Sequence, residues 1–344
     1  MRLGRAPSGK PPRLCALLLA LLLALPGCAP AQPLERTFFA MDTVMTLRLY
    51  QGGDGSLLDR AEARVRELEA QWSVTEENSE ICALNRGGRA ELSPETAELL
   101  GAALDMCRRT DGALDISTYP VLRAWGFTTG EYSVPGGEAI AALLPLVDYG
   151  RVALEAGAAA LPPGMEIDLG SVAKGYTGDA LAALLKQGGA DSALLDLGGN
   201  IQAVGSKPDG SPWRVAIRDP AGDGNIGVVE VADQAVVTSG GYERYFEEDG
   251  VRYWHIIDPA TGWPARSGLA SVTVVGESGL LCDGLSTALF VMGREGALEH
   301  WRQHRDFEAV LVSEDGSVTI TAGLEDRYVL GPGYEDRTVE VIHP

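Results

Sequence analysis

The order of the apolar stretches constrains the fold of this chain more than any other feature of its sequence. Several short stretches are typical of β-strands, and a few longer ones repeat apolar residues at helical spacing. The strand candidates are residues 192–198, 213–219, 227–233, 234–240, 252–258 and 270–276, and the helix candidates are residues 57–72, 94–109 and 173–187. The two kinds are mixed rather than strictly alternating, so the sequence predicts an α+β fold with largely antiparallel sheets.

The N-terminal residues resemble a secretion signal. A basic segment is followed by the apolar run 14–25, which is shorter than the roughly 20 residues that a membrane-spanning helix needs but suits the core of a signal peptide. The run ends in "LPGC", small residues before Cys28, as in bacterial lipoprotein signals. An ordinary secretory cleavage that leaves Cys28 unmodified is the alternative.

These features predict a domain organisation and a location. We expect residues 1–27 to be a lipoprotein signal peptide, Cys28 to carry the lipid, and residues 28–36 to be a short tether. Residues 37–344 contain no low-complexity linker or internal repeat and are expected to form one folded domain. The protein is then expected at the cell membrane, lipid-anchored on the extracytoplasmic (periplasmic or outer) face.

Charge and cysteine content exclude two classes of function. Removing residues 1–27, which carry four positive charges, moves the formal net charge from −20 to −24. A protein this acidic does not bind nucleic acid through a general basic surface. Cys82, Cys107 and Cys282 are scattered among apolar residues, so we expect them in the core rather than in a disulfide framework or a structural zinc site.

Residues 165–189 are a candidate anion site. We expect a short strand that ends at Asp168, an N-cap at Ser171, and a helix that stops at Gly188. Lys174 would lie in the first turn, where the helix dipole disfavours a cation unless an anion such as phosphate binds there. The alternative is a lysine whose amine simply reaches solvent. The stretch lacks the P-loop pattern.

A second candidate site lies in residues 280–293. Asp283 and Thr287 are four residues apart, so on a helix they share one face. A carboxylate and a hydroxyl suit Mg²⁺, which keeps water and phosphate oxygens as its other ligands. The alternative is an aspartate that caps a helix and a threonine in the core.

Other polar and aromatic residues have two interpretations each. Asp115 lies among apolar residues near Tyr119, Trp125 and Phe127, which supply either a surface for a flat ring system or ordinary core. His255 ends an apolar run before an Asp-Pro turn, where it could be a simple strand cap. His300 and His304 are spaced as in a helical zinc pair but lack a third ligand, so we expect a solvated helix face.

Taken in order, seven stretches closely resemble the ApbE family, the FAD:protein FMN transferases. The resemblance runs from about Phe38 to Gly293. It rests on "AMDTVMTL", "DGALDISTYPVLRAWGF", "IDLGSVAKGYTGD", "LLDLGGNIQAVGSKPDG", "VVTSGGYERYF", "HIIDPATGWPA" and "CDGLSTALFVMG". It implies an ApbE-like (T-fold-like) architecture for residues 37–344 and a flavin transferase activity.

The resemblance also implies a reaction. Enzymes of this family bind FAD with Mg²⁺, cleave the FAD pyrophosphate, and transfer FMN to a Ser or Thr hydroxyl of an acceptor protein, releasing AMP. The growing phosphate charge would be neutralised by Mg²⁺ and by Lys174. Either His255 or Asp283 would accept the proton of the acceptor hydroxyl.

Positions are carried over residue by residue. Asp283 and Thr287 match side-chain metal ligands, and Ser171 matches a position that offers its backbone carbonyl. Lys174 matches a lysine at the FAD site. Met41, Asp115 and His255 match positions that contact the flavin or the adenine.

Two residues depart from the family pattern, and two other functions remain open. Gly241 stands where a polar residue is common, and Trp254 where a second histidine is frequent. The same residues would suit an Mg²⁺-dependent FAD pyrophosphatase, and the anchor would equally suit a non-catalytic flavin-binding lipoprotein. Release of AMP with and without an acceptor would separate these functions.

Overall fold

A nine-stranded sheet runs through the folded part of the chain. The computed structural model describes residue 4 and residues 32–344, and Pro33–Pro344 forms one unit. The strand order is β1-β2-β6-β7-β10-β13-β14-β15-β17. Neighbouring strands are antiparallel except for β15 and β17, which are parallel. The predicted α+β fold with largely antiparallel sheets is therefore confirmed.

The strands of the large sheet are β1 (Leu34–Ala40), β2 (Thr43–Gln51), β6 (Ser192–Asp196), β7 (Ile201–Val204), β10 (Ala235–Gly240), β13 (Leu269–Gly276), β14 (Glu308–Ser313), β15 (Val318–Thr321) and β17 (Val339–Ile342). Three smaller sheets accompany it. They consist of β16 (Tyr328–Leu330), β9 (Asn225–Val231) and β8 (Trp213–Arg218); of β3 (Arg89–Glu91), β5 (Ala158–Ala160) and β4 (Ala153–Glu155); and of β11 (Tyr245–Glu248) and β12 (Val251–Trp254).

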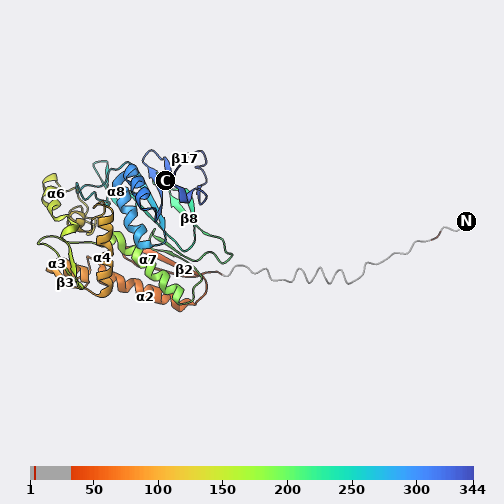
Figure 1. Ribbon diagram of the computed structural model, residues 1–344, viewed down its shortest axis with the longest axis horizontal. Coiled ribbons are helices and arrows are strands. Elements are labelled where there is room, and N and C mark those ends of the chain that lie inside the picture. The colour runs from red at the N-terminus through yellow and green to blue at the C-terminus, as the bar shows by residue number, and fades with distance from the viewer. Residues whose placement is uncertain (1–3, 5–31) are drawn as a thin grey trace. The chain divides into compact units, whose positions relative to one another are not determined.

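Helices α2 (Gly55–Trp72), α7 (Gly170–Gln187) and α8 (Gly279–His304) cover one side of the large sheet. The other helices are α3 (Glu80–Gly87), α4 (Pro94–Arg109), α5 (Tyr119–Ala124) and α6 (Gly137–Leu143), with short 3₁₀ turns at Ile116–Thr118, Leu144–Leu146, Tyr149–Arg151 and Ala322–Leu324. Helices α7 and α8 lie side by side near the middle of the folded unit, and α2 lies beside α7 (Figure 1).

Alternate residues of the central strands face two different cores. On β13, Val274 belongs to the core under α4 and α8, and Val275 to the core shared with the β16-β9-β8 sheet. This alternation follows from the period of two along a strand. At the other end of the large sheet, β1 and β2 bury one face against α2 and α7. The sheet is therefore covered on both faces in its middle and on one face at β1–β2.

Most helix starts follow from local sequence. Asp54 caps α2 and Ser93 caps α4, where Pro94 occupies the first turn. Ser278 caps α8 by accepting a hydrogen bond from the N–H of Leu281. Each cap satisfies a backbone donor that the first turn of a helix leaves free.

The start of α7 differs from the prediction. The N-cap is Leu169, and Ser171 is the second residue of the helix, so the predicted cap at Ser171 is wrong. The carboxylate of Asp168 accepts a 2.8 Å hydrogen bond from the N–H of Gly170, which supplies the capping interaction instead. Lys174 is consequently the fifth helical residue, just beyond the first turn. The predicted end at Gly188 is confirmed.

Other local predictions are corrected by tertiary pairing. Residues 165–168 join no strand, because Asn85 and Ile116 accept hydrogen bonds from the N–H groups of Ile167 and Asp168. The strand expected over 252–258 ends at Trp254.

His300 is buried rather than solvated and stacks on His304 with 4.1 Å between ring centroids. Cys107 and Cys282 are buried as expected, whereas Cys82 is only half-buried.

The N-terminal predictions lie largely outside the described residues. Residues 1–27, apart from Gly4, and Cys28 are not among them. Strand β1 begins at Leu34, so the last residues of the expected tether pair with β2. Within the described part of the chain, no helix combines the length and apolar character needed to cross a membrane.

Candidate active site

A pair of glycines brings α7 and α8 into direct contact. A Cβ at Gly175 would lie 2.2 Å from the carbonyl oxygen of Gly279 and 2.7 Å from Cβ of Asp283. A Cβ at Gly279 would lie 2.5 Å from the carbonyl oxygen of Gly175. Only glycine at both positions allows this backbone contact. The close approach places Asp283 against the second turn of α7.

Asp283 is bound to α7 by a buried hydrogen bond. Its Oδ2 accepts the N–H of Gly175 at 2.8 Å, and the residue is 5% exposed. In a regular helix this N–H points at the carbonyl oxygen of Ser171, four residues earlier. The Asp283 carboxylate and the Ser171 carbonyl therefore compete as acceptors for the same donor, the N–H of Gly175. Burial raises the pKa of the Asp283 carboxyl, while Lys174, Asn200 and the Gly175 N–H act in the opposite direction.

Thr287 lies one turn further along α8 and joins a chain of hydroxyl groups. Its Oγ1 is 3.3 Å from Oγ of Ser239, which is 2.8 Å from Oγ of Ser286. Ser239 comes from the end of β10, so this chain links the strand to the helix. The predicted helical pairing of Asp283 and Thr287 is confirmed, since both lie in α8.

The oxygens in this region suit a hard cation. They are the carboxylate of Asp283, the hydroxyl of Thr287 and the backbone carbonyl of Ser171. Within residues 32–344, no cluster of three or more His, Cys, Asp or Glu side chains could hold a metal ion. A cation held here would need to retain water or substrate oxygens, which is the usual behaviour of Mg²⁺.

Lys174 is the common neighbour of four titratable side chains. Burial raises the pKa of Asp168, Glu243 and Asp283, and the Lys174 ammonium acts in the opposite direction on each of them. The ammonium also helps to lower the pKa of His255. These residues come from the segment before α7, the β10–β11 loop, α8 and the segment after β12. The fold thus gathers distant parts of the chain around one amine.

His255 is held by the backbone of Arg244. Its N–H and its Nδ1 lie 3.1 and 3.2 Å from the Arg244 carbonyl oxygen. A carbonyl oxygen only accepts, so Nδ1 carries the proton and Nε2 keeps its lone pair. Burial lowers the pKa of His255 to about 4, and the Arg244 and Lys174 cations add to this effect. The ring is therefore neutral at neutral pH, with an acceptor at Nε2.

A tight turn brings Met41 to the same region. Met41 and Asp42 have φ values of 48° and 58° and connect β1 to β2 in the manner of a two-residue hairpin loop. The N–H of Met41 donates to Oε1 of Glu69 at 2.6 Å, and the Thr177 hydroxyl lies 3.8 Å from its sulfur. Asp42 lies 3.9 Å from the guanidinium of Arg244. Met41 thus lies beside α7 at Thr177, which is three residues after Lys174 in that helix.

The carboxylate of Asp115 accepts hydrogen bonds from its own loop and from the segment at Tyr149. Oδ1 accepts the N–H and the hydroxyl of Ser117 at 2.8 and 2.6 Å, and Oδ2 accepts the N–H of Tyr149 at 3.1 Å. The next residue, Ile116, accepts the N–H of Asp168 at 2.9 Å. The loop therefore borders the site, while the Asp115 side chain holds the loop together.

The nearby aromatic residues are mainly core. Trp125 is fully buried, and its indole N–H donates to the Gly262 carbonyl at 3.0 Å. Phe127 is also buried and contacts His255 edge-on, with 6.3 Å between ring centroids. The core interpretation of this stretch is supported, and one of its rings orients the histidine.

The two departures from the family pattern contact each other. A Cβ at Gly241 would lie 2.9 Å from the indole of Trp254. Trp254 is buried, its N–H donates to the Ala265 carbonyl at 3.1 Å, and the Arg266 guanidinium lies 4.0 Å from its ring centroid. A larger residue at position 241 would collide with the tryptophan. The two residues that depart from the family pattern therefore pack directly against each other.

Sequence reasoning missed several residues of this site. Asp168 was interpreted as a strand end, and Glu243 and Ser239 were not assigned. Asn200 lies beside Asp283 in a small hollow that Lys174 and Gln202 also line. Asn200 Nδ2 and Gln202 Oε1 are buried without a hydrogen-bond partner of normal geometry. The stretches "IDLGSVAKG" and "DLGGN" contain Asp168 and Asn200, but sequence alone does not show that these stretches lie together in the fold.

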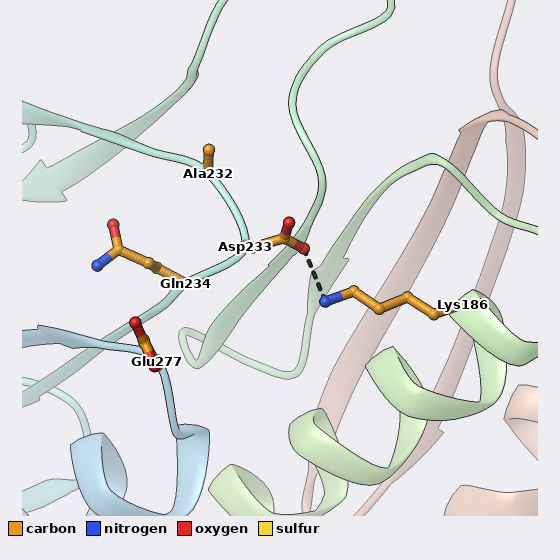
Figure 2. Close-up of a pocket in the computed structure, with 5 residues that line it drawn as sticks. All are labelled: Lys186, Ala232, Asp233, Gln234 and Glu277. Atoms are coloured by element: carbon orange, nitrogen blue, oxygen red, sulfur yellow. Dashed lines mark ion pairs between the residues drawn. The ribbon is translucent and has the colours of Figure 1, made fainter.

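A more open hollow lies elsewhere. Figure 2 shows it lined by Lys186, Ala232, Asp233, Gln234 and Glu277, with Lys186 of α7 pointing at Asp233. The two charges form an ion pair at 2.8 Å. Lys186 lies twelve residues after Lys174 on α7, which is about 18 Å along the helix. This hollow is therefore distinct from the Lys174 site, and its one ammonium group is already paired with Asp233.

Most of the chain is similar in sequence to known proteins of one family. The model of the ApbE family matches residues 41–311. The FAD:protein FMN transferase of Treponema pallidum is 33% identical over 90% of this chain and 94% of its own length. That of Vibrio cholerae is 33% identical over 80% of this chain and 87% of its own.

Solved structures show the same fold. The ApbE protein of Thermotoga maritima superposes with a TM-score of 0.82 at 31% identity, over 86% of this chain and 99% of its own. The flavinyl transferase ApbE of Pseudomonas stutzeri, in its apo form, gives a TM-score of 0.76 at 32% identity, over 86% of this chain and 98% of its own.

Proposed function

The chain belongs to the ApbE family, and from this membership we infer that it is an FAD:protein FMN transferase. Its substrates are FAD and an acceptor protein. We propose further that the acceptor group is a Ser or Thr hydroxyl and that the reaction depends on Mg²⁺. One observation carries the proposal: Asp283 of α8 accepts the N–H of Gly175, the residue after Lys174 on α7, and the Lys174 ammonium acts on the pKa of both Asp283 and His255.

The bonds in the reaction balance without a further reactant. The acceptor oxygen forms a bond to the phosphorus on the FMN side of the pyrophosphate. The bond from that phosphorus to the bridging oxygen breaks, and AMP leaves with the bridging oxygen. The acceptor hydroxyl loses its proton to a base.

We assign the metal to α7 and α8. Asp283 and Thr287 would hold Mg²⁺ through their side chains, and Ser171 through its backbone carbonyl. When bound, Mg²⁺ would withdraw charge from the phosphate oxygens of FAD. The hydrogen bond from the Gly175 N–H to Asp283 supports this assignment, because that N–H is the donor that the Ser171 carbonyl would accept in a regular helix.

We assign the general base to His255. Its neutral ring presents the Nε2 lone pair, whereas the Asp283 carboxylate is engaged with the Gly175 N–H and the proposed metal. Lys174 would bind the pyrophosphate and neutralise charge as it develops. Met41 lies beside α7 and would contact the flavin or the adenine. Asp115 would act by shaping the bordering loop.

The location of the enzyme is a separate proposal. We propose that Cys28 carries lipid and anchors the protein at the membrane, facing away from the cytoplasm. The basic start, the short apolar run and "LPGC" support it. The acidic composition argues that nucleic acid is not a partner.

One experiment tests the activity. The protein is incubated with FAD, Mg²⁺ and an acceptor domain, and the acceptor is examined by mass spectrometry. A mass increase equal to one bound FMN, with AMP released only when acceptor is present, supports the transferase. AMP release without any change in the acceptor would indicate a pyrophosphatase. FAD binding without AMP release would indicate a flavin-binding protein.

A further inference from the structure

The tip of the β1–β2 hairpin exposes two large apolar side chains. Phe39 and Val44 are cross-strand partners, and they are 61% and 59% exposed. Partners across a strand pair lie on the same face of the sheet, so the two side chains form one apolar pair. Neighbouring residues of the hairpin, among them Phe38 and Met45, face the opposite way and are buried against α2 and α7.

The apolar character is confined to the end of the hairpin beside the turn. The next pair on the same face is Thr37 and Thr46, whose hydroxyl oxygens are 3.1 Å apart. The pair beyond it is Glu35 and Arg48, which form an ion pair at 2.7 Å. Polar groups away from the turn are thus matched to each other. The Phe39–Val44 pair, by contrast, is open to a partner.

This pair is directly connected to the active site. The turn that follows Phe39 carries Met41 and Asp42, and Asp42 lies 3.9 Å from Arg244. The Arg244 carbonyl holds Nδ1 of His255 at 3.2 Å. An extended chain advances about 3.3 Å per residue. A segment that lies over the apolar pair would therefore reach the site within a few residues.

The backbone of β1 is also available. β1 is the first strand of the large sheet, and in the described part of the chain it pairs only with β2. An edge strand of this kind can bind an extended segment through main-chain hydrogen bonds. The guanidinium of Arg66 reaches the Phe39 carbonyl at 3.5 Å. This long, exposed contact is one that an incoming strand can displace.

We propose that Phe39, Val44 and the outer edge of β1 form the docking surface for the acceptor protein. Apolar side chains of an extended acceptor segment would lie on the pair and direct the hydroxyl toward His255. The inference rests on the proposed function, which requires a protein segment to enter this site. A lipid surface fits less well, because hydrocarbon cannot satisfy the backbone groups of an open strand edge.

The test measures acceptor binding apart from transfer. The full chain in detergent, without a bilayer, is titrated with an acceptor domain whose target hydroxyl has been removed. The double variant Phe39→Ser/Val44→Ser should raise the Kd for the acceptor about tenfold or more. Val329→Ser, at a 54% exposed position on β16, is the matched control and should leave the Kd unchanged. Thermal unfolding and FAD affinity of all proteins should match the parent.

The outcomes separate the two proposals. A parent-like Kd in the double variant would overturn the docking surface, even if the parent transfers FMN. A raised Kd with no FMN transfer by the parent would support docking and reject the proposed activity. If the double variant keeps its acceptor Kd but loses binding to phosphatidylglycerol vesicles, the pair is a lipid contact, which also overturns the inference.

Discussion

The N–H of Gly175 donates a 2.8 Å hydrogen bond to the carboxylate of Asp283, across the contact between α7 and α8. The bond exists because neither Gly175 nor Gly279 has a side chain to hold the helices apart. It joins the helix that carries Lys174 to the helix that carries the proposed metal ligands. The relative position of these groups therefore depends on a close backbone contact in addition to side-chain packing.

Gly175→Ala should separate the two helices. Its Cβ would lie 2.2 Å from a backbone oxygen, which cannot move without shifting α8. We expect about 1–3 kcal/mol of destabilisation, as for other overpacked sites, and a larger proportional loss of FMN transfer. Gly178→Ala is the control, because its Cβ would make ordinary contacts of 3.4 Å. Urea unfolding and single-turnover transfer measure the two effects. Parent-like transfer by Gly175→Ala would contradict the role of the helix contact.

Asp283→Ala should abolish Mg²⁺-dependent transfer and preserve the fold. The variant loses a hydrogen bond to Gly175, but it also removes a carboxylate whose burial raises its pKa. These effects oppose each other, so the free energy of unfolding should change little. Covalent flavin fluorescence of the acceptor on a gel, measured across an Mg²⁺ titration, reports transfer. Full activity at low Mg²⁺ would refute the metal assignment.

His255 and His300 should differ in their effects on activity and stability. Burial lowers the pKa of both to about 4, below the value of about 6.5 expected in the unfolded chain. The unfolded state therefore binds protons first, so each histidine contributes stability above about pH 6.5 that is lost as pH falls toward 4. His300→Gln should reduce this loss by up to about 1.4 kcal/mol per pH unit and leave transfer unchanged. His255→Gln should reduce it similarly and also greatly slow transfer.

Each variant is compared with the parent at the same pH, because burial also raises the pKa of carboxyl groups such as those of Asp179 and Glu243. Denaturant unfolding from pH 7 to pH 4.5 gives the stability difference. Single-turnover transfer over the same range should fall only as pH approaches 4, where His255 gains a proton. A His255→Gln variant with parent-like transfer would exclude His255 as the base.

Lys174→Met should separate FAD binding from chemistry. The substitution keeps the aliphatic stem and removes the ammonium that faces Asp283 and Glu243. FAD affinity should fall by about 1.5–3 kcal/mol, the usual range for a hydrogen bond to a charged group. Transfer should fall further if the ammonium stabilises charge in the transition state.

The matched control for Lys174→Met is Lys186→Met, which removes an ammonium from the far end of the same helix. It should leave FAD affinity and transfer unchanged. Fluorescence quenching of FAD gives the affinity, and single-turnover kinetics gives the rate. If both lysine variants behave like the parent, Lys174 is a solvated surface charge.

Cys28→Ala should prevent lipid attachment. The variant is expected either to be released from membranes or to accumulate as an unprocessed precursor. Membrane fractionation and gel migration of the whole chain distinguish these results from the parent. A variant that fractionates and migrates like the parent would contradict the lipoprotein proposal.

The sequence by itself determined the secondary elements that depend on local patterns. The apolar spacing in residues 94–109 predicts α4 to the residue, and the structure adds Ser93 as its cap and Pro94 in its first turn. The four-residue spacing of Asp283 and Thr287 placed them on one helix face for the same reason. Family membership also followed from ordered local stretches. These features are encoded over a few neighbouring residues, so no distant partner is needed to form them.

Tertiary structure decided the features that depend on distant partners. Ser171 was expected to cap α7, but Asp168 provides the capping interaction, and residues 165–168 pair with Asn85 and Ile116 rather than forming a strand. His300 is buried because α8 packs its last turns against Phe307. The tautomer of His255 is set by the carbonyl of Arg244. Two glycines on different helices, Gly175 and Gly279, let α7 and α8 approach closely enough for Asp283 to bind the N–H of Gly175. Sequence spacing carries no information about such contacts, because burial and hydrogen bonding across the fold are settled only when separate segments pack together.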